Sequence, residues 1–239
     1  WVNTYARIPK ENQLIHHSTY LQVPPEWLGK TFIDEAEHLK AVNPTAYAHE
    51  YLGEVTGTGG MVFENVVART ITDDEIVQFD QVGQGVDWGY FPDPFAWSKS
   101  HFDANRRVLY IFDEFKALKM SNREVYDHLV KHKGYTPDQM IIADSAEPKS
   151  IADFREYGAN CRGAEKGPES VNYSMKWLQT LSEIVIDPVR CPNHLEEFLN
   201  YELEQDRDGE YISAYPDHDN HFIDAVRYRT NLFWRRRGV

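Results

Sequence analysis

In the segment Gln81-Val-Gly-Gln-Gly-Val-Asp-Trp-Gly89, small or polar residues alternate with residues that are apolar except for Gln84, as in a β-strand. Gly83, Gly85 and Asp87 therefore share one face of the expected strand. Because glycines flank the aspartate on that face, open space is expected beside its carboxylate, enough for metal ions and a phosphate. The alternative interpretation is an aspartate that caps a turn at the strand end, with glycines that mark bulges.

Strands and helices alternate outward from this segment. The strand-like runs are Val82–Trp88, Phe95–Phe102, Val108–Phe115, Met140–Ala143 and Ile184–Ile186. Helical patterns cover Asn122–His132, Pro148–Tyr157, Glu169–Leu181, His194–Glu204 and Asn220–Phe233. Three strands joined by hairpins and then followed by helix, strand and helix predict an α/β fold, a mixed central β-sheet flanked by helices.

Residues 1–70 lack this pattern and are predicted to be a connector, with the folded domain at residues 71–239. Helices are expected after Pro24-Pro25 and after Asn43-Pro44. The glycine-rich stretch Thr56–Gly60 lacks the Gly-Lys-Ser/Thr of a phosphate loop and is predicted to be a turn. The chain begins at Trp1 rather than at a methionine, which is expected of a piece of a longer protein.

The charge is unevenly distributed along the chain. The net charge is −13, the wrong sign for a protein that binds DNA by charge alone. From Glu196 to Asp224 there are ten acidic residues and one basic residue, Arg207. One interpretation is a solvated acidic face. The other is a carboxylate-rich centre that recruits divalent metal ions before it accepts phosphate.

Other features narrow the class of protein. No apolar run has the length of roughly 18 residues that a membrane span needs, and no secretory signal pattern is present. Cys161 and Cys191 are too few for a disulfide framework or a zinc ligand set, so a reducing cytosol is expected.

Three aspartates occupy positions where metal chemistry is expected. Asp87 lies on the first strand, Asp144 ends the run Met140–Ala143, and Asp224 lies in the last helix one turn after His221. Hard cations such as Mg²⁺ and Mn²⁺ need carboxylates that converge from different elements, and a pair of such ions hydrolyses phosphodiesters. Taken singly, Asp144 is also explained as a helix cap, and Asp224 as an exposed partner of Arg227 or Tyr228.

Four other groups of residues are weaker candidates for a functional site. His128 and His132 have a zinc-compatible spacing but no third ligand. Asp113-Glu114 is a candidate for a fourth carboxylate of the site, although a strand-end pair that faces water is the simpler interpretation. Lys149 is a candidate phosphate contact, although a surface lysine is the simpler interpretation. Arg235–Arg237 is either a DNA contact or a basic terminus.

Several motifs together resemble the nuclease half of large terminase subunits from tailed bacteriophages. The three nuclease motifs correspond to Gly85-Val-Asp-Trp-Gly-Tyr90 with Pro92-Asp-Pro-Phe-Ala96, to Ile141-Ile-Ala-Asp-Ser-Ala-Glu-Pro-Lys-Ser150, and to His218-Asp-Asn-His-Phe-Ile-Asp-Ala-Val-Arg-Tyr228. The connector, through His16-His-Ser-Thr-Tyr20, His49–Glu54 and Gly59–Phe63, resembles the stretch that joins the ATPase half of the motor to its nuclease half.

The resemblance implies an RNase H-like endonuclease that cuts concatemeric phage DNA at the start and end of packaging. Asp87, Asp144 and Asp224 match the metal-binding triad, which implies two Mg²⁺ or Mn²⁺ ions, and His221 matches a neighbouring position as an extra ligand or proton shuttle. Double-stranded DNA, the terminase small subunit and the portal protein are the implied partners, in the host cytoplasm. The isolated domain is expected to be a monomer. Without a Walker A loop, ATP-driven translocation is not expected from this chain.

The hairpin predicted around Asp206-Arg-Asp-Gly209 is hypothesised to overhang the active site and to regulate access of DNA; a plain connection is the alternative. Two other functions are weighed. One is a non-catalytic module that docks on DNA or portal, and the other is a different RNase H-like nuclease such as a junction resolvase.

Overall fold

The computed structural model describes residues 18–42, 47, 51–52, 60–207 and 210–234, with the side chains of 41–42 left out. Several expectations lie outside these residues: the extended piece at His16-His17, most of the helix after Asn43, the turn from Thr56 to Gly59, the tip of the hairpin at Asp208-Gly209, and the Arg235–Arg237 cluster. No helix within the described part is both long and apolar enough to cross a membrane.

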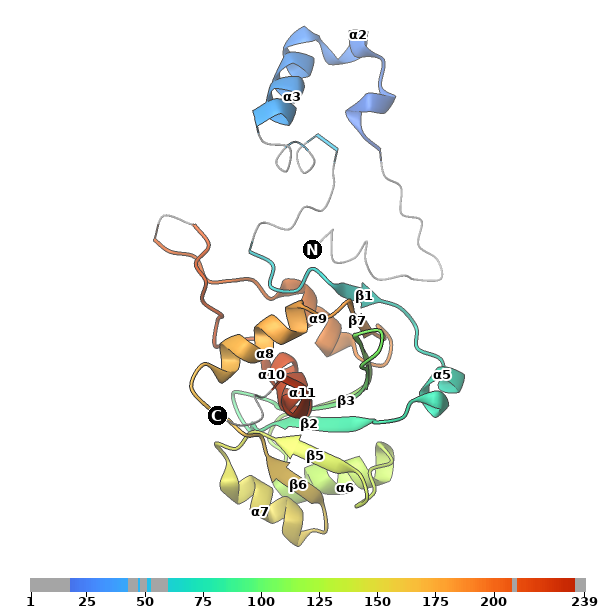
Figure 1. Cartoon of the computed structure of the whole chain (residues 1–239), viewed down its shortest axis with the longest axis vertical. Helices are drawn as coiled ribbons and strands as arrows, with labels where there is room; N and C mark the ends of the chain where they lie inside the picture. Colours follow the sequence, from blue (N-terminus) through green and yellow to red (C-terminus); the bar gives the residue numbers. More distant parts are fainter. Residues whose placement is uncertain (1–17, 43–46, 48–50, 53–59, 208–209, 235–239) are drawn as a thin grey trace.

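The central feature is one mixed sheet of seven strands in the order β1-β7-β4-β3-β2-β5-β6 (Figure 1). The strands are β1 Val66–Ala68, β2 Gly83–Asp87, β3 Phe95–Asp103, β4 Val108–Ala117, β5 Met140–Ala143, β6 Asn160–Gly163 and β7 Glu183–Ile186. Strands β2, β3 and β4 form an antiparallel meander, and the remaining neighbours pair in parallel. The predicted mixed α/β sheet is confirmed.

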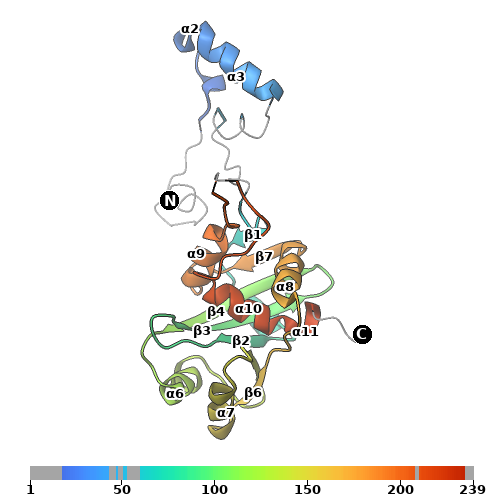
Figure 2. The same cartoon turned by 90° about the vertical axis from the view of Figure 1, so that its left-hand side faces the viewer.

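Helices cover both faces of this sheet. They are α5 Asp73–Gln78, α6 Asn122–His132, α7 Pro148–Glu156, α8 Ser170–Gln179, α9 Pro192–Asn200, α10 His221–Arg229 and α11 Asn231–Trp234. Figures 1 and 2 show α6 and α7 on one side, and α8, α9 and α10 on the other. Each face of the sheet has its own core: one contains Trp97 of β3 and Phe154 of α7, and the other contains Leu109 of β4 and Phe198 of α9.

The N-terminal part consists of η1 Tyr20–Gln22, α2 Pro25–Leu28 and α3 Lys30–Val42, which lie away from the sheet in Figures 1 and 2. Residues 60–68, which were expected in the connector, pack on the sheet instead. Strand β1 pairs with β7, and Phe63 is fully buried against Phe198 with ring centroids 4.8 Å apart.

Some predicted elements need correction. The single helix expected over Asn220–Phe233 is interrupted at Thr230, whose hydroxyl bonds back to the Val226 carbonyl, so that α10 ends there and α11 follows. Strand β6 and helix α5 were not predicted. The predicted hairpin is present on both sides of its tip: Gln205 and Tyr211 form an antiparallel bridge, and the Asp206 amide donates to the Glu210 carbonyl at 2.9 Å.

Candidate metal centre

The ends of two parallel strands bring the first two aspartates together. Strands β2 and β5 pair with Val86 opposite Ala143, and the Asp144 amide donates to the Val86 carbonyl at 2.9 Å. Asp87 and Asp144 therefore lie at the carboxyl ends of adjacent parallel strands, where ligand sites of α/β sheets form. The indole of Trp88 donates to the Asp144 carbonyl at 3.0 Å, which fixes the loop after β5 to the end of β2.

Helix α10 crosses β2 and supplies the other two candidates. A Cβ atom at Gly85 would lie 1.8 Å from the Ala225 carbonyl oxygen, and one at Gly83 would lie 2.0 Å from Arg229 Nε. The expectation that these glycines leave room for ions was wrong: α10 fills that space. The glycines instead let the helix backbone approach the strand closely enough to present His221 and Asp224 beside Asp87.

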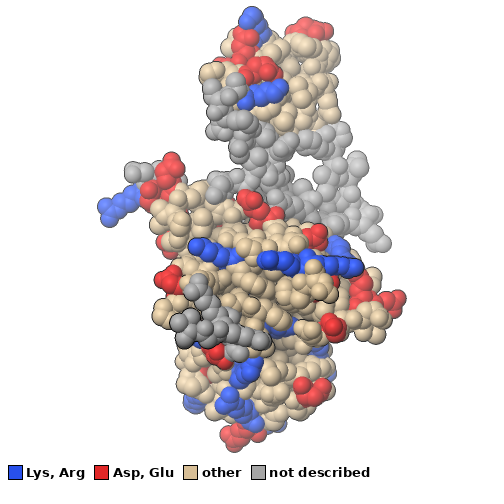
Figure 3. Space-filling model, viewed as in Figure 1, with Lys and Arg blue, Asp and Glu red and all other residues tan. Residues whose placement is uncertain are grey.

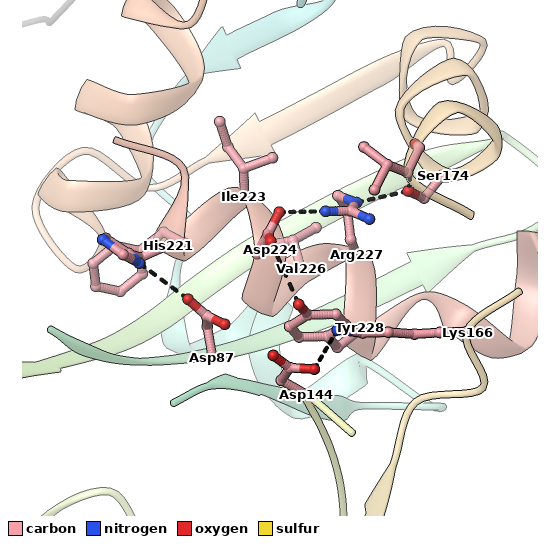
Figure 4. A network of polar contacts seen from close by, with 12 residues as sticks. Asp87, Asp144, Lys166, Ser174, His221, Ile223, Asp224, Val226, Arg227 and Tyr228 are labelled. Carbon is pink, nitrogen blue, oxygen red and sulfur yellow. Dashed lines mark hydrogen bonds and ion pairs between the residues drawn. The ribbon is translucent and has the colours of Figure 1, made fainter. Parts of the chain in front are cut away.

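The three carboxyl groups face a common space between β2, the end of β5 and α10 (Figure 4). Burial, with repulsion from Asp224 and Asp144, raises the pKa of Asp87 to about 6, although its contact with His221 opposes the shift. The His221 Nδ1 atom lies 3.0 Å from Asp87 Oδ2, and this hydrogen bond raises the pKa of His221. Half-buried carboxylates that repel one another fit the site of a hard divalent cation.

Two cations and a phenol contact two of these three carboxylates. Lys166 forms an ion pair with Asp144, and Arg227 with Asp224. The Tyr228 hydroxyl donates to Asp224 at 3.4 Å. Asp224 thus makes the contacts named as its alternative interpretation, but at 17% side-chain exposure rather than on an exposed face. Asp144 accepts from the Ala146 amide at 2.9 Å and so stabilises a turn before α7.

A second group of ligand-type residues lies deeper in the domain. Within the described residues, Glu114, Cys191 and His194 form the one set of three or more His, Cys, Asp or Glu ligand atoms that all lie within 4.8 Å of one another. The expectation that Glu114 faces water was wrong, because β4 continues to Ala117 and the side chain is 6% exposed.

The glutamate and histidine atoms of this group that could bind a metal ion already form hydrogen bonds within the protein. His194 Nδ1 contacts Glu114 at 2.7 Å, and its Nε2 contacts the Ser98 hydroxyl at 2.8 Å. The carboxylate also accepts from the amides of Asn193 and His194, each at 3.0 Å. Burial raises the pKa of the Cys191 thiol well above its usual range, which disfavours the thiolate that binds metals. The group is better explained as the anchor of α9 to the sheet.

Replacing Glu114 by alanine is expected to lower the free energy of unfolding by about 3 kcal/mol, because it leaves several buried donors without an acceptor. Urea unfolding measures the change. Asp113→Ala, which removes a partly exposed ion pair with Lys133, is the matched control and should cost less than about 1 kcal/mol. Mn²⁺ binding per folded molecule should stay unchanged in Glu114→Ala; a lost binding site would identify this group as the metal centre after all.

The remaining weak candidates do not join the triad. His128 stacks on Phe115 with ring centroids 3.9 Å apart, and its ring lies 4.7 Å from that of His132. No third ligand atom accompanies these histidines among the described residues. Lys149 lies exposed in the first turn of α7, as the simpler interpretation expected.

Glu197, which was not predicted from the sequence, holds the helix that carries His221 and Asp224. Its Oε2 atom accepts hydrogen bonds from the amides of Phe222 and Ile223, at 2.7 and 3.1 Å. These amides belong to the first turn of α10, which has no side-chain cap at Asn220. Burial raises the pKa of Glu197 to about 8. A glutamate within an amphipathic helix pattern carries no sequence signal of this contact.

The raised pKa of Glu197 predicts a pH-dependent stability. Ionising this carboxyl group costs more in the folded state than in the unfolded chain, so the unfolding free energy should fall as pH rises from 4.5 toward about 8. One proton gives a slope of at most about 1.4 kcal/mol per pH unit. Glu197→Gln should make this fall shallower, as measured by urea unfolding across the range. Identical slopes for both proteins would contradict the assignment.

Comparisons with known proteins identify the relatives of this chain. Residues 87–231 match the family described as Terminase RNAseH like domain, so the match includes all three aspartates. The whole chain is 42% identical, over 245 residues, to the large terminase subunit of Bacillus phage SPP1, of which it covers 57%. Over 92% of its length it is 27% identical to the PBSX phage terminase large subunit of Bacillus subtilis strain 168, of which it covers 51%. The chain spans about half the length of these curated relatives.

Solved structures show the same fold. The crystal structure of the large terminase nuclease domain from bacteriophage SPP1 with bound Mn is 40% identical, with a TM-score of 0.66, over 71% of this chain and 97% of that one. The large terminase nuclease domain of P22 is 15% identical, with a TM-score of 0.51, over 74% and 94% of the two chains. The expected RNase H-like fold is confirmed.

Proposed function

The chain belongs to the terminase RNase H-like family, and from that membership we propose that it is a metal-dependent endonuclease for double-stranded DNA. Its role would be to cut concatemeric phage DNA when genome packaging begins and ends. The observation that carries the proposal is the convergence of Asp87, Asp144 and Asp224 from three elements, with His221 in contact with Asp87.

The donor set fits Mg²⁺ or Mn²⁺, since it offers carboxylate oxygens and a single imidazole but no thiolate. The SPP1 nuclease domain was solved with bound Mn. We infer that Asp87, Asp144 and Asp224 hold two such ions, which when bound would activate a water molecule and stabilise the departing 3′ oxygen.

The chain's own residues then orient the site. His221 is directed by its 3.0 Å contact with Asp87, while its Nε2 atom lies 3.8 Å from Asp93 at the rim. In this position His221 is suited to hold or pass a proton beside the metal ligands. Trp88 and Glu197 hold the loop after β5 and the start of α10 in place.

The negative net charge of the chain indicates that DNA is brought to this domain by other parts of the motor rather than bound by the domain alone. The net charge of −13 predicts weak, nonspecific DNA affinity for the isolated domain, which we expect to be a monomer. Lysine and arginine side chains nevertheless gather in a row across the upper part of the sheet domain on the face seen in Figure 3. In the host cytoplasm the ATPase half of the motor, the small subunit and the portal would raise the local DNA concentration.

The proposal predicts that supercoiled plasmid is nicked and linearised with Mn²⁺ or Mg²⁺ and left intact with EDTA. Agarose electrophoresis over time measures both products, and readdition of metal after EDTA should restore cutting. Absence of cleavage with either metal, for a protein shown to be folded, would favour a docking module instead.

A further inference from the structure

Lys166 reaches the candidate centre from the loop between β6 and α8. Its ammonium group pairs with Asp144 and lies 5.0 Å from the centroid of the Tyr228 ring, whose hydroxyl contacts Asp224. Figure 4 shows the lysine side chain extended over that ring toward the carboxylates. Lys166 is therefore paired with one of the three aspartates and packs on the tyrosine that contacts another.

The backbone before Lys166 is fixed from both sides. The amide of Ala164 donates to the Ala143 carbonyl at 2.8 Å, which continues the β5–β6 pairing up to Asp144. The side chain of Asn231, 2% exposed, accepts from the Glu165 amide at 3.1 Å and donates to the Glu165 carbonyl at 2.9 Å. A buried amide that bonds both backbone groups of one loop residue holds the next residue at a defined place.

The two cations at the centre, Arg227 and Lys166, differ in how freely their side chains can move. Arg227 is 6% exposed, and its guanidinium is held by Asp224 and by the Ser174 hydroxyl at 2.6 Å. The Lys166 side chain is 39% exposed and ends in a compact charge on a flexible stem. Arg227 is thus a fixed counterion of Asp224, whereas Lys166 can exchange one anionic partner for another.

We propose that Lys166 is a phosphate-binding residue of the nuclease site; the proposal rests on the proposed function above. In this structure Lys166 is the counterion of Asp144. With a divalent cation held by Asp144, the Lys166 ammonium group would lose this partner and would be free to bind a non-bridging oxygen of the scissile phosphodiester. There it balances the negative charge that develops on the phosphate during hydrolysis.

The test compares Lys166→Met and Lys166→Arg with Lys131→Met, an exposed lysine at the end of α6 that serves as the control. Fluorescence anisotropy measures binding of a short labelled duplex in Ca²⁺ at several salt concentrations. Lys166→Met should bind about tenfold more weakly, with a salt slope reduced by about 1, while Lys166→Arg stays close to the unmutated protein. Plasmid cleavage in Mn²⁺ should slow by about 10²-fold in Lys166→Met only.

Calorimetric titration with Mn²⁺ separates this role from a structural one. Lys166→Met should bind Mn²⁺ at least as tightly as the unmutated protein, because a competing cation has been removed from Asp144. Weaker Mn²⁺ binding would show that Lys166 holds Asp144 in place, and unchanged duplex affinity and salt slope would exclude a phosphate contact; either result overturns the proposal. Failure of the unmutated protein to cut plasmid would refute the proposed function instead. The plasmid assay measures this separately from duplex binding and Mn²⁺ titration.

Discussion

Asp87→Asn is expected to lower the rate of plasmid cleavage by at least about 10³-fold, since metal-held charge stabilisation contributes several kcal/mol to such reactions. Asparagine keeps the shape of the side chain but removes the charge that would bind an ion. It also replaces a charged acceptor by a neutral amide, which weakens the hydrogen bond that directs His221. Mn²⁺ affinity, measured by calorimetry, should fall together with the rate.

The same substitution should leave the fold as stable or more stable. Burial and two neighbouring carboxylates raise the pKa of Asp87 from 3.8 to about 6, so above that pH its ionised form opposes folding. Asp87→Asn removes this opposition, and its unfolding free energy at neutral pH should equal or exceed that of the unmutated protein. Loss of activity with gain of stability is typical of a residue kept for function.

Asp127→Asn, on the exposed side of α6, is the control and should change neither cleavage nor Mn²⁺ binding. Cleavage by Asp87→Asn at an undiminished rate would mean that the metal centre lies elsewhere. Loss of cleavage together with unfolding, as measured by circular dichroism, would contradict the expected stability.

The parts of the fold that were predictable from sequence are those with a strong apolar pattern. Met140–Ala143 and Asn122–His132 have the predicted bounds. The first is an unbroken apolar run, and the second begins directly after its N-cap, Ser121. Strand β6 reads Asn-Cys-Arg-Gly and has one buried apolar residue, so an edge strand of this kind leaves no period to detect. Helix α5 did carry a signal, the capping box of Thr72 and Glu75.

The candidate site was predictable where chemistry sits at the end of an element, as for Asp87 and Asp144. What depends on packing was not. Whether Glu114 meets water or His194 depends on a helix 80 residues away, and sequence spacing does not encode that contact. Lys166 lies in a loop with no periodicity, so its pairing with Asp144 appears only in the structure.

A substitution at Gly85 tests whether the metal centre depends on close contact between α10 and β2. Gly85→Ala is expected to lower the unfolding free energy by about 4 kcal/mol or more, because the added methyl group would lie 1.8 Å from the Ala225 carbonyl oxygen. The obstacle is helix backbone, so a side-chain rotation cannot relieve the clash. Helix α10 would have to move away from β2 and carry His221 and Asp224 with it.

Gly167→Ala is the matched control, because a Cβ atom there meets nothing within 4 Å and the same methyl group should change stability by less than about 0.5 kcal/mol. Urea unfolding compares the two variants, and Mn²⁺ titration of whatever Gly85→Ala protein folds measures the second consequence. A folded Gly85→Ala protein should bind Mn²⁺ more weakly, since the displaced helix no longer presents Asp224 to Asp87. If the stability and the Mn²⁺ affinity of Gly85→Ala equal those of the unmutated protein, then α10 tolerates a wider separation from β2. Close contact would then not be what brings these carboxylates together.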